Sequence, residues 1–156
     1  MQKIIVAIDG YAATGKSSQA KRLAKTLGYT YIDTGAMYRA ITYFALQQEP
    51  TGTLNLVLLV AALDPLRINS KNTDLGQQTF LNQKDISQAI REPGVTSKVS
   101  EVARIPEVRA FLVEQQRALG KKKGIVMDGR DIGTVVFPDA EGKCFLTATP
   151  GVRAKR

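Results

Sequence analysis

A short glycine-containing segment carries the residue types that bind phosphate groups. Residues 10–17 read Gly-Tyr-Ala-Ala-Thr-Gly-Lys-Ser, which fits the phosphate-binding pattern G-x-x-x-x-G-K-[ST]. Glycines let the backbone approach a phosphate closely, a lysine reaches the β- and γ-phosphates, and a serine hydroxyl ligates Mg²⁺. We therefore predict that a nucleoside triphosphate binds at Gly10, Tyr11, Ala12, Ala13, Thr14, Gly15, Lys16, Ser17 and Ser18, with Ser17 as the metal ligand.

The residues on either side of this segment predict the elements that position it. Residues 3–9 form a β-branched apolar run, which is typical of a buried parallel strand. Residues 18–27 carry apolar side chains at helical spacing, and Gly28 is a natural helix end. A strand, a glycine loop and a helix N-terminus together present N–H groups and the positive end of a helix dipole to an anion. This context disfavours the alternative of a glycine turn that carries Lys-Ser by chance.

Two further strand ends carry polar residues. A short strand predicted over 29–33 is followed by Thr34 and Gly35 and then by a helix that carries Arg39. This arrangement suits a second phosphorylated ligand, although a helix-capping Thr34 and a solvent-facing Arg39 explain it equally well. The strand predicted over 124–128 ends in a carboxylate and continues as Gly-Arg-Asp. Ligands of parallel sheets bind at the carboxyl ends of the strands, so we expect the site there.

Strands and helices alternate along the rest of the chain. Residues 66–86 have the short alternating pieces and turn residues of a small antiparallel insertion. Strands joined by helical crossovers imply a parallel sheet covered by helices on both faces. The predicted fold is therefore α/β, a three-layer P-loop NTPase fold with a parallel sheet flanked by helices and a small antiparallel β insertion. The other predicted elements are helices over 36–47, 54–63 (buried), 95–104 and 107–119, a break at 92–94, a strand over 143–148 and a helix from 149–150 onward.

Composition limits the chemistry. The chain has no histidine and one cysteine, which excludes Ser-His-Asp and Cys-His catalysis, an internal disulfide and a plausible zinc site. Cys144 lies in a predicted core strand, and we interpret it as a buried, inert thiol. No apolar run approaches the ~20 residues of a membrane span, and the first residues run directly into a core strand. We therefore expect a cytoplasmic protein without a membrane partner.

The net charge of +8 has two competing explanations, a nucleic-acid surface or arginines gathered around small phosphorylated molecules. The one dense basic run, Lys121-Lys122-Lys123, has no interleaved aromatic residues for base stacking. We interpret it as a solvated helix end, where cations suit the helix dipole. The pattern favours small-molecule nucleotides and no nucleic acid as partners.

Four blocks of the chain, taken in order, resemble bacterial cytidylate kinase. They are residues 8–17, the run Asp-Thr-Gly-Ala-Met-Tyr-Arg at 33–39, the run Ile-Pro-Glu-Val-Arg at 105–109, and Asp-Gly-Arg-Asp-Ile-Gly-Thr-Val-Val-Phe-Pro at 128–138. The last block is specific to that family among nucleoside monophosphate kinases. The resemblance implies the reaction ATP + (d)CMP → ADP + (d)CDP with Mg²⁺, with CMP, dCMP and ATP as the partners. We expect the protein to be a monomer.

The resemblance also implies roles for individual residues. Thr34, Arg109 and Asp131 are expected to read the cytosine ring, and a carboxylate, an arginine and a hydroxyl suit its amine and its N3 and O2 acceptors. Asp131 could instead form an ion pair with Arg130 that shapes a turn, and Arg109 could instead lie on a solvated helix face. The remaining implied roles are a sugar contact from Ser100, phosphate contacts from Arg39 and Arg130, and catalysis by Lys16, Arg130 and two lid arginines, Arg153 and Arg156.

The implied organisation has a phosphate-loop core at 1–35 and 120–156 and a CMP-binding region at 36–119, with the β insertion at about 65–86. The sequence departs from the family at Tyr11, where a proline is usual, and we expect this to affect the rigidity of the loop. It also stops at Arg156, before the rest of the lid and the last strand of the family. We expect a chain that ends there to turn over poorly, because water reaches the transferring group.

Two other functions remain open at the level of sequence. One is a related P-loop kinase that acts on UMP or another small acceptor. The other is a non-catalytic domain that binds nucleotides or nucleic acid, which the lack of stacking aromatic residues disfavours.

Overall fold

The computed structural model describes residues 2–11, 15–49, 51, 53–73 and 76–147. The chain divides into two compact units, of which the first comprises Met1–Thr34 with Gln116–Arg156 and the second Gly35–Gln115. Among the described residues, no helix combines the length and the apolar character that crossing a bilayer requires.

The first unit is built on a parallel sheet. Within the described residues it has four strands in the order β2-β6-β1-β7, formed by Thr30–Asp33, Ile125–Gly129, Ile5–Gly10 and Gly142–Leu146. All three neighbouring pairs are parallel. Every residue of β1 and of β6 is buried, which agrees with the continuous apolar runs that predict them. The carboxyl ends of β1, β2 and β6 therefore meet at one edge of the sheet.

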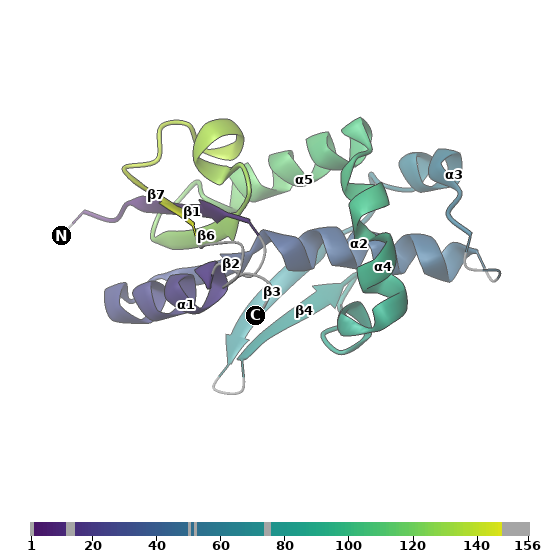
Figure 1. Ribbon diagram of the computed structural model, residues 1–156, viewed down its shortest axis with the longest axis horizontal. Helices are drawn as coiled ribbons and strands as arrows, with labels where there is room; N and C mark the ends of the chain where they lie inside the picture. The colour runs from purple at the N-terminus through teal and green to yellow at the C-terminus, as the bar shows by residue number, and fades with distance from the viewer. Residues whose placement is uncertain (1, 12–14, 50, 52, 74–75, 148–156) are drawn as a thin grey trace. The chain divides into compact units, whose positions relative to one another are not determined.

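Helix α1, Lys16–Leu27, follows β1 and packs along this sheet (Figure 1). Its small residues Ala20 and Ala24 are buried against Val6 and Val126, so the helix approaches the strands closely. Gly15 precedes the helix with φ 82° and Gly28 follows it with φ 69°, both in the left-handed region that favours glycine. The predicted strand and helix are confirmed, with the helix beginning at Lys16 rather than Ser18.

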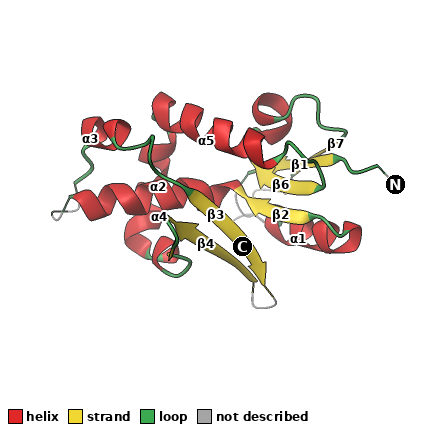
Figure 2. Cartoon of the chain, turned by 180° about the vertical axis from the view of Figure 1, so that it is seen from behind, coloured by secondary structure: helices red, strands yellow, loops and turns green. Residues whose placement is uncertain are grey.

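The second unit combines helices with a small antiparallel sheet. The sheet consists of β3, Ile68–Thr73, β4, Gly76–Leu81, and β5, Lys84–Asp85, and Figure 2 shows β3 and β4 side by side. The antiparallel insertion predicted over 66–86 is thus confirmed. The helices of this part of the chain are α2, Thr34–Gln48, α3, Leu56–Ala61, the short η1, Ala89–Arg91, α4, Pro93–Ala103, and α5, Pro106–Leu119.

Three local predictions were wrong. The helix predicted as buried over 54–63 is shorter, because Asn55 caps it by accepting the Leu58 N–H at 3.1 Å. Of that helix, Val57 is 79% exposed and only Leu59 is buried. The break predicted at 92–94 instead begins α4, since proline suits the first position of a helix. Cys144 is exposed rather than buried, because β7 lies at the edge of the described sheet.

Candidate functional site

The phosphate-binding segment lies where β1 ends and α1 begins. Gly10 is the last residue of β1, and Gly15 and Lys16 lead into the helix. No described side chain caps the N-terminus of α1, and its first turn carries no acidic residue. The first N–H groups and the dipole of the helix are therefore suited to an anion. Ala12, Ala13 and Thr14 of the predicted site lie outside the described residues.

Tyr11 packs within the first unit. Its ring meets Phe145 of β7 edge to face, with the ring centroids 6.0 Å apart. Aromatic pairs with this edge-to-face geometry attract each other. The position at which this chain departs from the family pattern therefore has a packing contact of its own.

Asp128 is a buried carboxylate at the carboxyl end of β6, directly beside β1. Asp128 is 1% exposed, and its Oδ2 accepts a 2.6 Å hydrogen bond from the Tyr31 hydroxyl. Burial, together with the negative charge of Asp33, raises the pKa of the Asp128 carboxyl above its usual value. The Tyr31 hydroxyl, the positive charge of Lys16 and a hydrogen bond from Ser17 act against this rise. Burial likewise raises the pKa of the Tyr31 hydroxyl.

These contacts bring the phosphate-binding segment and Asp128 together. The Ser17 hydroxyl and the charge of Lys16 both act to lower the pKa of the Asp128 carboxyl, so both lie close to this carboxylate. A hydroxyl beside a carboxylate is a donor set that Mg²⁺ accepts, since this ion takes one or two protein oxygens and completes its shell with water and phosphate. The described residues hold no group of three or more His, Cys, Asp or Glu side chains suited to a metal. The oxygens of Ser17 and Asp128 therefore fit a magnesium ion shared with a phosphate.

The segment after β6 carries Arg130 and Asp131 at the same edge of the sheet. Gly129 is the last residue of β6 and pairs in register with Asp9, which directly precedes Gly10. Arg130 is exposed and Asp131 half-buried, and a short π-helix, Ile132–Val136, follows them. The strand register alone therefore places the two predicted acceptor-binding residues next to the phosphate-binding segment.

Thr34 lies at the end of β2, in the same unit. It is buried, and its hydroxyl donates a 2.8 Å hydrogen bond to the backbone oxygen of Asp128. The threonine proton is thus used within the protein, and the hydroxyl oxygen keeps its capacity to accept. A ligand that contacts the Thr34 hydroxyl must therefore donate a hydrogen bond to it.

Gly129 has no room for a side chain. A Cβ at this position would lie 2.6 Å from Thr34 Oγ1 and 2.7 Å from Ile132 Cδ1. We expect Gly129→Ala to lower the free energy of unfolding by about 1–3 kcal/mol, because the neighbours must shift. Gly94→Ala is the matched control, since a Cβ there meets nothing within 4 Å. Urea unfolding of both variants tests this, and equal midpoints for the two would contradict it.

The other predicted site residues lie elsewhere. Arg39 on α2 and Arg109 on α5 are partly buried, and Ser100 on α4 is exposed; all three belong to the second unit. Arg109 follows Val108, which is fully buried, so it flanks the buried face of its helix. Arg153 and Arg156 lie outside the described residues.

Sequence reasoning missed two residues that shape this edge of the sheet, Tyr31 and Asp9. Tyr31 donates to Asp128, and Asp9 accepts two backbone hydrogen bonds from the start of the π-helix. The sequence does carry a signal for Asp9: it is a carboxylate inside an apolar strand run, and such a group requires hydrogen-bond partners when it is buried. Its partners are more than a hundred residues away in the chain, and no local pattern names them.

The sheet, the phosphate-binding segment and the buried carboxylate define an α/β protein of the P-loop class. Residues 6–156 match the family model described as cytidylate kinase. The chain belongs to the cytidylate kinase family.

Individual relatives agree with this assignment. The chain is 52% identical over 160 residues to the cytidylate kinase of Flavobacterium johnsoniae, an alignment that covers 100% of this chain and 70% of that protein. It is 52% identical over 155 residues to the cytidylate kinase of Lactiplantibacillus plantarum, which covers 99% of this chain and 68% of that protein. The chain therefore spans about 70% of the length of these relatives.

Proposed function

We propose that this chain transfers the γ-phosphoryl group of ATP to CMP or dCMP. The observation that carries the proposal is the meeting of Lys16, Ser17 and Asp128 at the carboxyl edge of a parallel sheet, in a chain of the cytidylate kinase family. A lysine, a hydroxyl and a buried carboxylate are the parts with which P-loop enzymes hold a triphosphate and its Mg²⁺.

The donor nucleotide occupies residues 10–18 in this proposal. The N–H groups at the start of α1 receive the phosphates, and the Lys16 ammonium lies against the β- and γ-phosphates. Ser17 and Asp128 hold Mg²⁺, which when bound neutralises charge on the phosphate oxygens. The burial of Asp128 at the carboxyl end of β6 supports this assignment, because a buried carboxylate requires a compensating partner and a cation is one.

The acceptor nucleotide lies beside the donor, at the ends of β2 and β6. The Thr34 oxygen and the Asp131 carboxylate accept from the exocyclic amine of cytosine, while Arg109 donates to its acceptors. Arg130 and Arg39 contact the phosphate, for which the planar guanidinium fork is suited. Ser100 contacts the sugar. Residues 1–35 with 120–156 form the phosphate-loop core in this proposal, and 36–119 form the CMP-binding region.

The transfer itself requires no covalent intermediate on the protein. An oxygen of the CMP phosphate attacks the γ-phosphorus in line and the bond to the β-phosphate oxygen breaks, which releases ADP and leaves CDP. Lys16 and Arg130 stabilise the charge that spreads over the transferring group, and Arg153 and Arg156 are the two further catalytic arginines of the proposal. Catalysis thus consists of positioning and charge neutralisation, in agreement with a chain that has no histidine.

The choice of acceptor tests the proposed function. With ATP as donor, we expect kcat/KM for CMP and dCMP to exceed that for UMP and AMP by about 100-fold, because a site built to pair with a donor group rejects an analogue that lacks it. Product formation is followed by chromatographic separation of the nucleotides. A chain that phosphorylates UMP as well as CMP would be the related kinase with a broader acceptor, and one that phosphorylates neither would refute the proposal.

Asp131→Asn sharpens the same test. An asparagine amide can turn its NH₂ or its oxygen toward the ring, so we expect the CMP-over-UMP preference to fall about tenfold. Asp139→Asn is the matched control, an exposed carboxylate further along the same segment. A preference that stays unchanged in Asp131→Asn would remove this residue from the cytosine site.

The proposal includes a monomer in the cytoplasm that does not bind nucleic acid. The single cysteine, which leaves no partner for an internal disulfide, supports the cytoplasmic location. The absence of nucleic acid is supported by the position of the basic run at 121–123. The run follows the end of α5 after Gly120, where cations suit the helix dipole, as expected for a solvated helix end.

A further inference from the structure

Asp9 uses both oxygens of a buried carboxylate on the backbone of a distant segment. It is 7% exposed and is the penultimate residue of β1. Oδ1 accepts from the N–H of Ile132 at 2.7 Å, and Oδ2 accepts from the N–H of Gly133 at 2.8 Å. Hydrogen bonds from N–H groups to a carboxylate are among the stronger ones in proteins, and more so when buried.

The two ends of this contact belong to the two nucleotide-binding segments. Asp9 directly precedes Gly10, where the phosphate-binding segment begins, and Ile132 directly follows Asp131. Backbone N–H groups at 132 and 133 lie in the first turn of the π-helix, so holding them fixes where the helix starts. Arg130 and Asp131 are then confined between Gly129 in the sheet and two anchored residues.

Gly133 leaves just enough space for this contact. A Cβ at Gly133 would lie 3.3 Å from Asp9 Oδ2 and 3.3 Å from Lys143 Cδ. A side chain there would press on the carboxylate from the other side. Because Gly133 has no side chain, its N–H can approach the buried Asp9 carboxylate, and the π-helix therefore lies close to the end of β1.

We propose that Asp9 is a positioning residue for the acceptor nucleotide: its carboxylate anchors the start of the π-helix and thereby orients Arg130 and Asp131 toward CMP. The inference rests on the proposed function, because CMP is the ligand that these two residues would meet. Both oxygens of Asp9 accept from the backbone, so we assign this residue a role in positioning and none in direct contact with the nucleotide.

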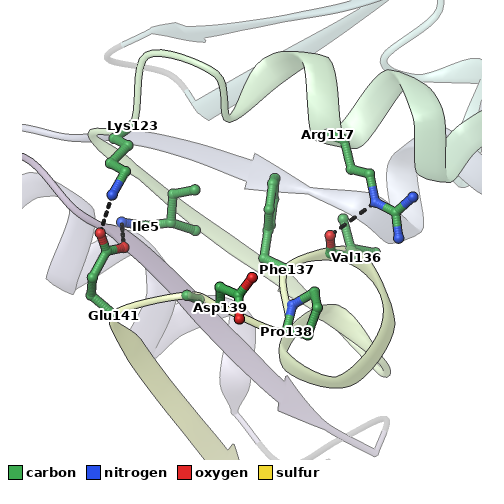
Figure 3. Close-up of a pocket in the computed structure, with 9 residues that line it drawn as sticks. Ile5, Arg117, Lys123, Val136, Phe137, Pro138, Asp139 and Glu141 are labelled. Carbon is green, nitrogen blue, oxygen red and sulfur yellow. Dashed lines mark hydrogen bonds and ion pairs between the residues drawn. The ribbon is translucent and has the colours of Figure 1, made fainter.

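A second carboxylate supplies a matched control at the opposite end of β1. Glu141 Oε1 accepts from the N–H of Ile5 at 3.1 Å and Glu141 also pairs with Lys123, as Figure 3 shows. These residues line a pocket of about 340 Å³ at the start of the strand, whereas the phosphate-binding segment follows its end. Asp9 and Glu141 thus both accept from backbone N–H groups next to an end of β1, but only Asp9 lies at the nucleotide edge.

Binding of CMP and of ATP, measured separately by calorimetric titration, distinguishes positioning from stability. Asp9→Asn keeps the size of the side chain and one acceptor but turns an NH₂ group toward the second N–H. We expect the Kd for CMP to rise about tenfold and the Kd for ATP to change by less than about threefold, because Arg130 and Asp131 serve the acceptor. Glu141→Gln is expected to leave both constants within about twofold of wild type. Amide hydrogen exchange at Ile132 and Gly133 should accelerate only in Asp9→Asn.

Several results would overturn the inference. Equal weakening of CMP and ATP binding by Asp9→Asn, or CMP binding that stays unchanged while the two amides exchange faster, contradicts a positioning role. If Asp9→Asn does not fold, Gly133→Ala replaces it, because the added Cβ presses on the same carboxylate. Unchanged CMP binding in Gly133→Ala would also contradict the positioning role of Asp9. If the wild-type chain has no affinity for CMP, the proposed function is refuted as well. If the wild-type chain binds CMP and neither variant changes the affinity, only the role of Asp9 is refuted.

Discussion

Replacing Lys16 with methionine is expected to lower kcat/KM for phosphoryl transfer from ATP to CMP by about 10³-fold. Lys16 is the first residue of α1, and its charge already acts on the buried Asp128. No other described residue at the start of that helix supplies a positive side chain to the phosphates. Loss of one preorganised electrostatic group in an active site costs about 10²–10³ in rate, and Lys16 also contributes to binding of the triphosphate. A coupled assay of ADP formation measures the change.

Lys25→Met is the control for this prediction. Lys25 lies on the same helix, in its last turn, and is exposed. Its loss should leave kcat/KM within about twofold of wild type and weaken only the interaction with the helix dipole. If the two lysine variants lost equal activity, the effect would belong to the stability of α1 and not to the phosphate site.

Asp128→Asn should separate activity from stability. We expect kcat to fall about 100-fold and the Mg²⁺ concentration for half-maximal activity to rise, because the neutral amide is a poor ligand for Mg²⁺. The Tm should stay equal or rise. The pKa of Asp128 is raised in the folded protein, so its charge is less favourable there than in the unfolded chain at neutral pH, and a neutral isostere removes that cost. Asparagine also keeps an oxygen to accept from Tyr31.

The measurements are a Mg²⁺ titration of the rate and a thermal unfolding curve, with Asp139→Asn as the exposed control. That control should change neither quantity. A Tm several degrees lower with activity and Mg²⁺ dependence intact would show that Asp128 holds the fold together and does not serve the metal.

The parts of the structure that sequence predicts are those encoded locally. The apolar run before Gly10, the helical spacing after Lys16 and the helix end at Gly28 each act within a few residues, and the structure confirms them. The antiparallel insertion is predictable for the same reason, because alternation and turn residues set its pairing. The family itself was also predictable, since its four blocks are contiguous stretches of sequence.

The parts that sequence does not predict depend on distant partners. Asp128 lies beside Tyr31, nearly a hundred positions earlier, and the contact becomes visible only once β2 and β6 are paired. The exposure of Cys144 follows from the place of β7 at the sheet edge, which hydrophobicity along a strand does not encode. The π-helix after Asp131 begins with two N–H groups that donate hydrogen bonds to the Asp9 carboxylate, and its residues alone carry no helical pattern.

Hydrogen exchange of the wild-type chain with each nucleotide tests the central claim most directly, namely that neighbouring strand ends hold two different nucleotides. A non-hydrolysable ATP analogue with Mg²⁺ should slow amide exchange in residues 10–18, and CMP alone should slow exchange in residues 129–133. With both ligands present, both segments should be protected. Protection of the same segment by both nucleotides, or CMP that protects neither, would contradict the account.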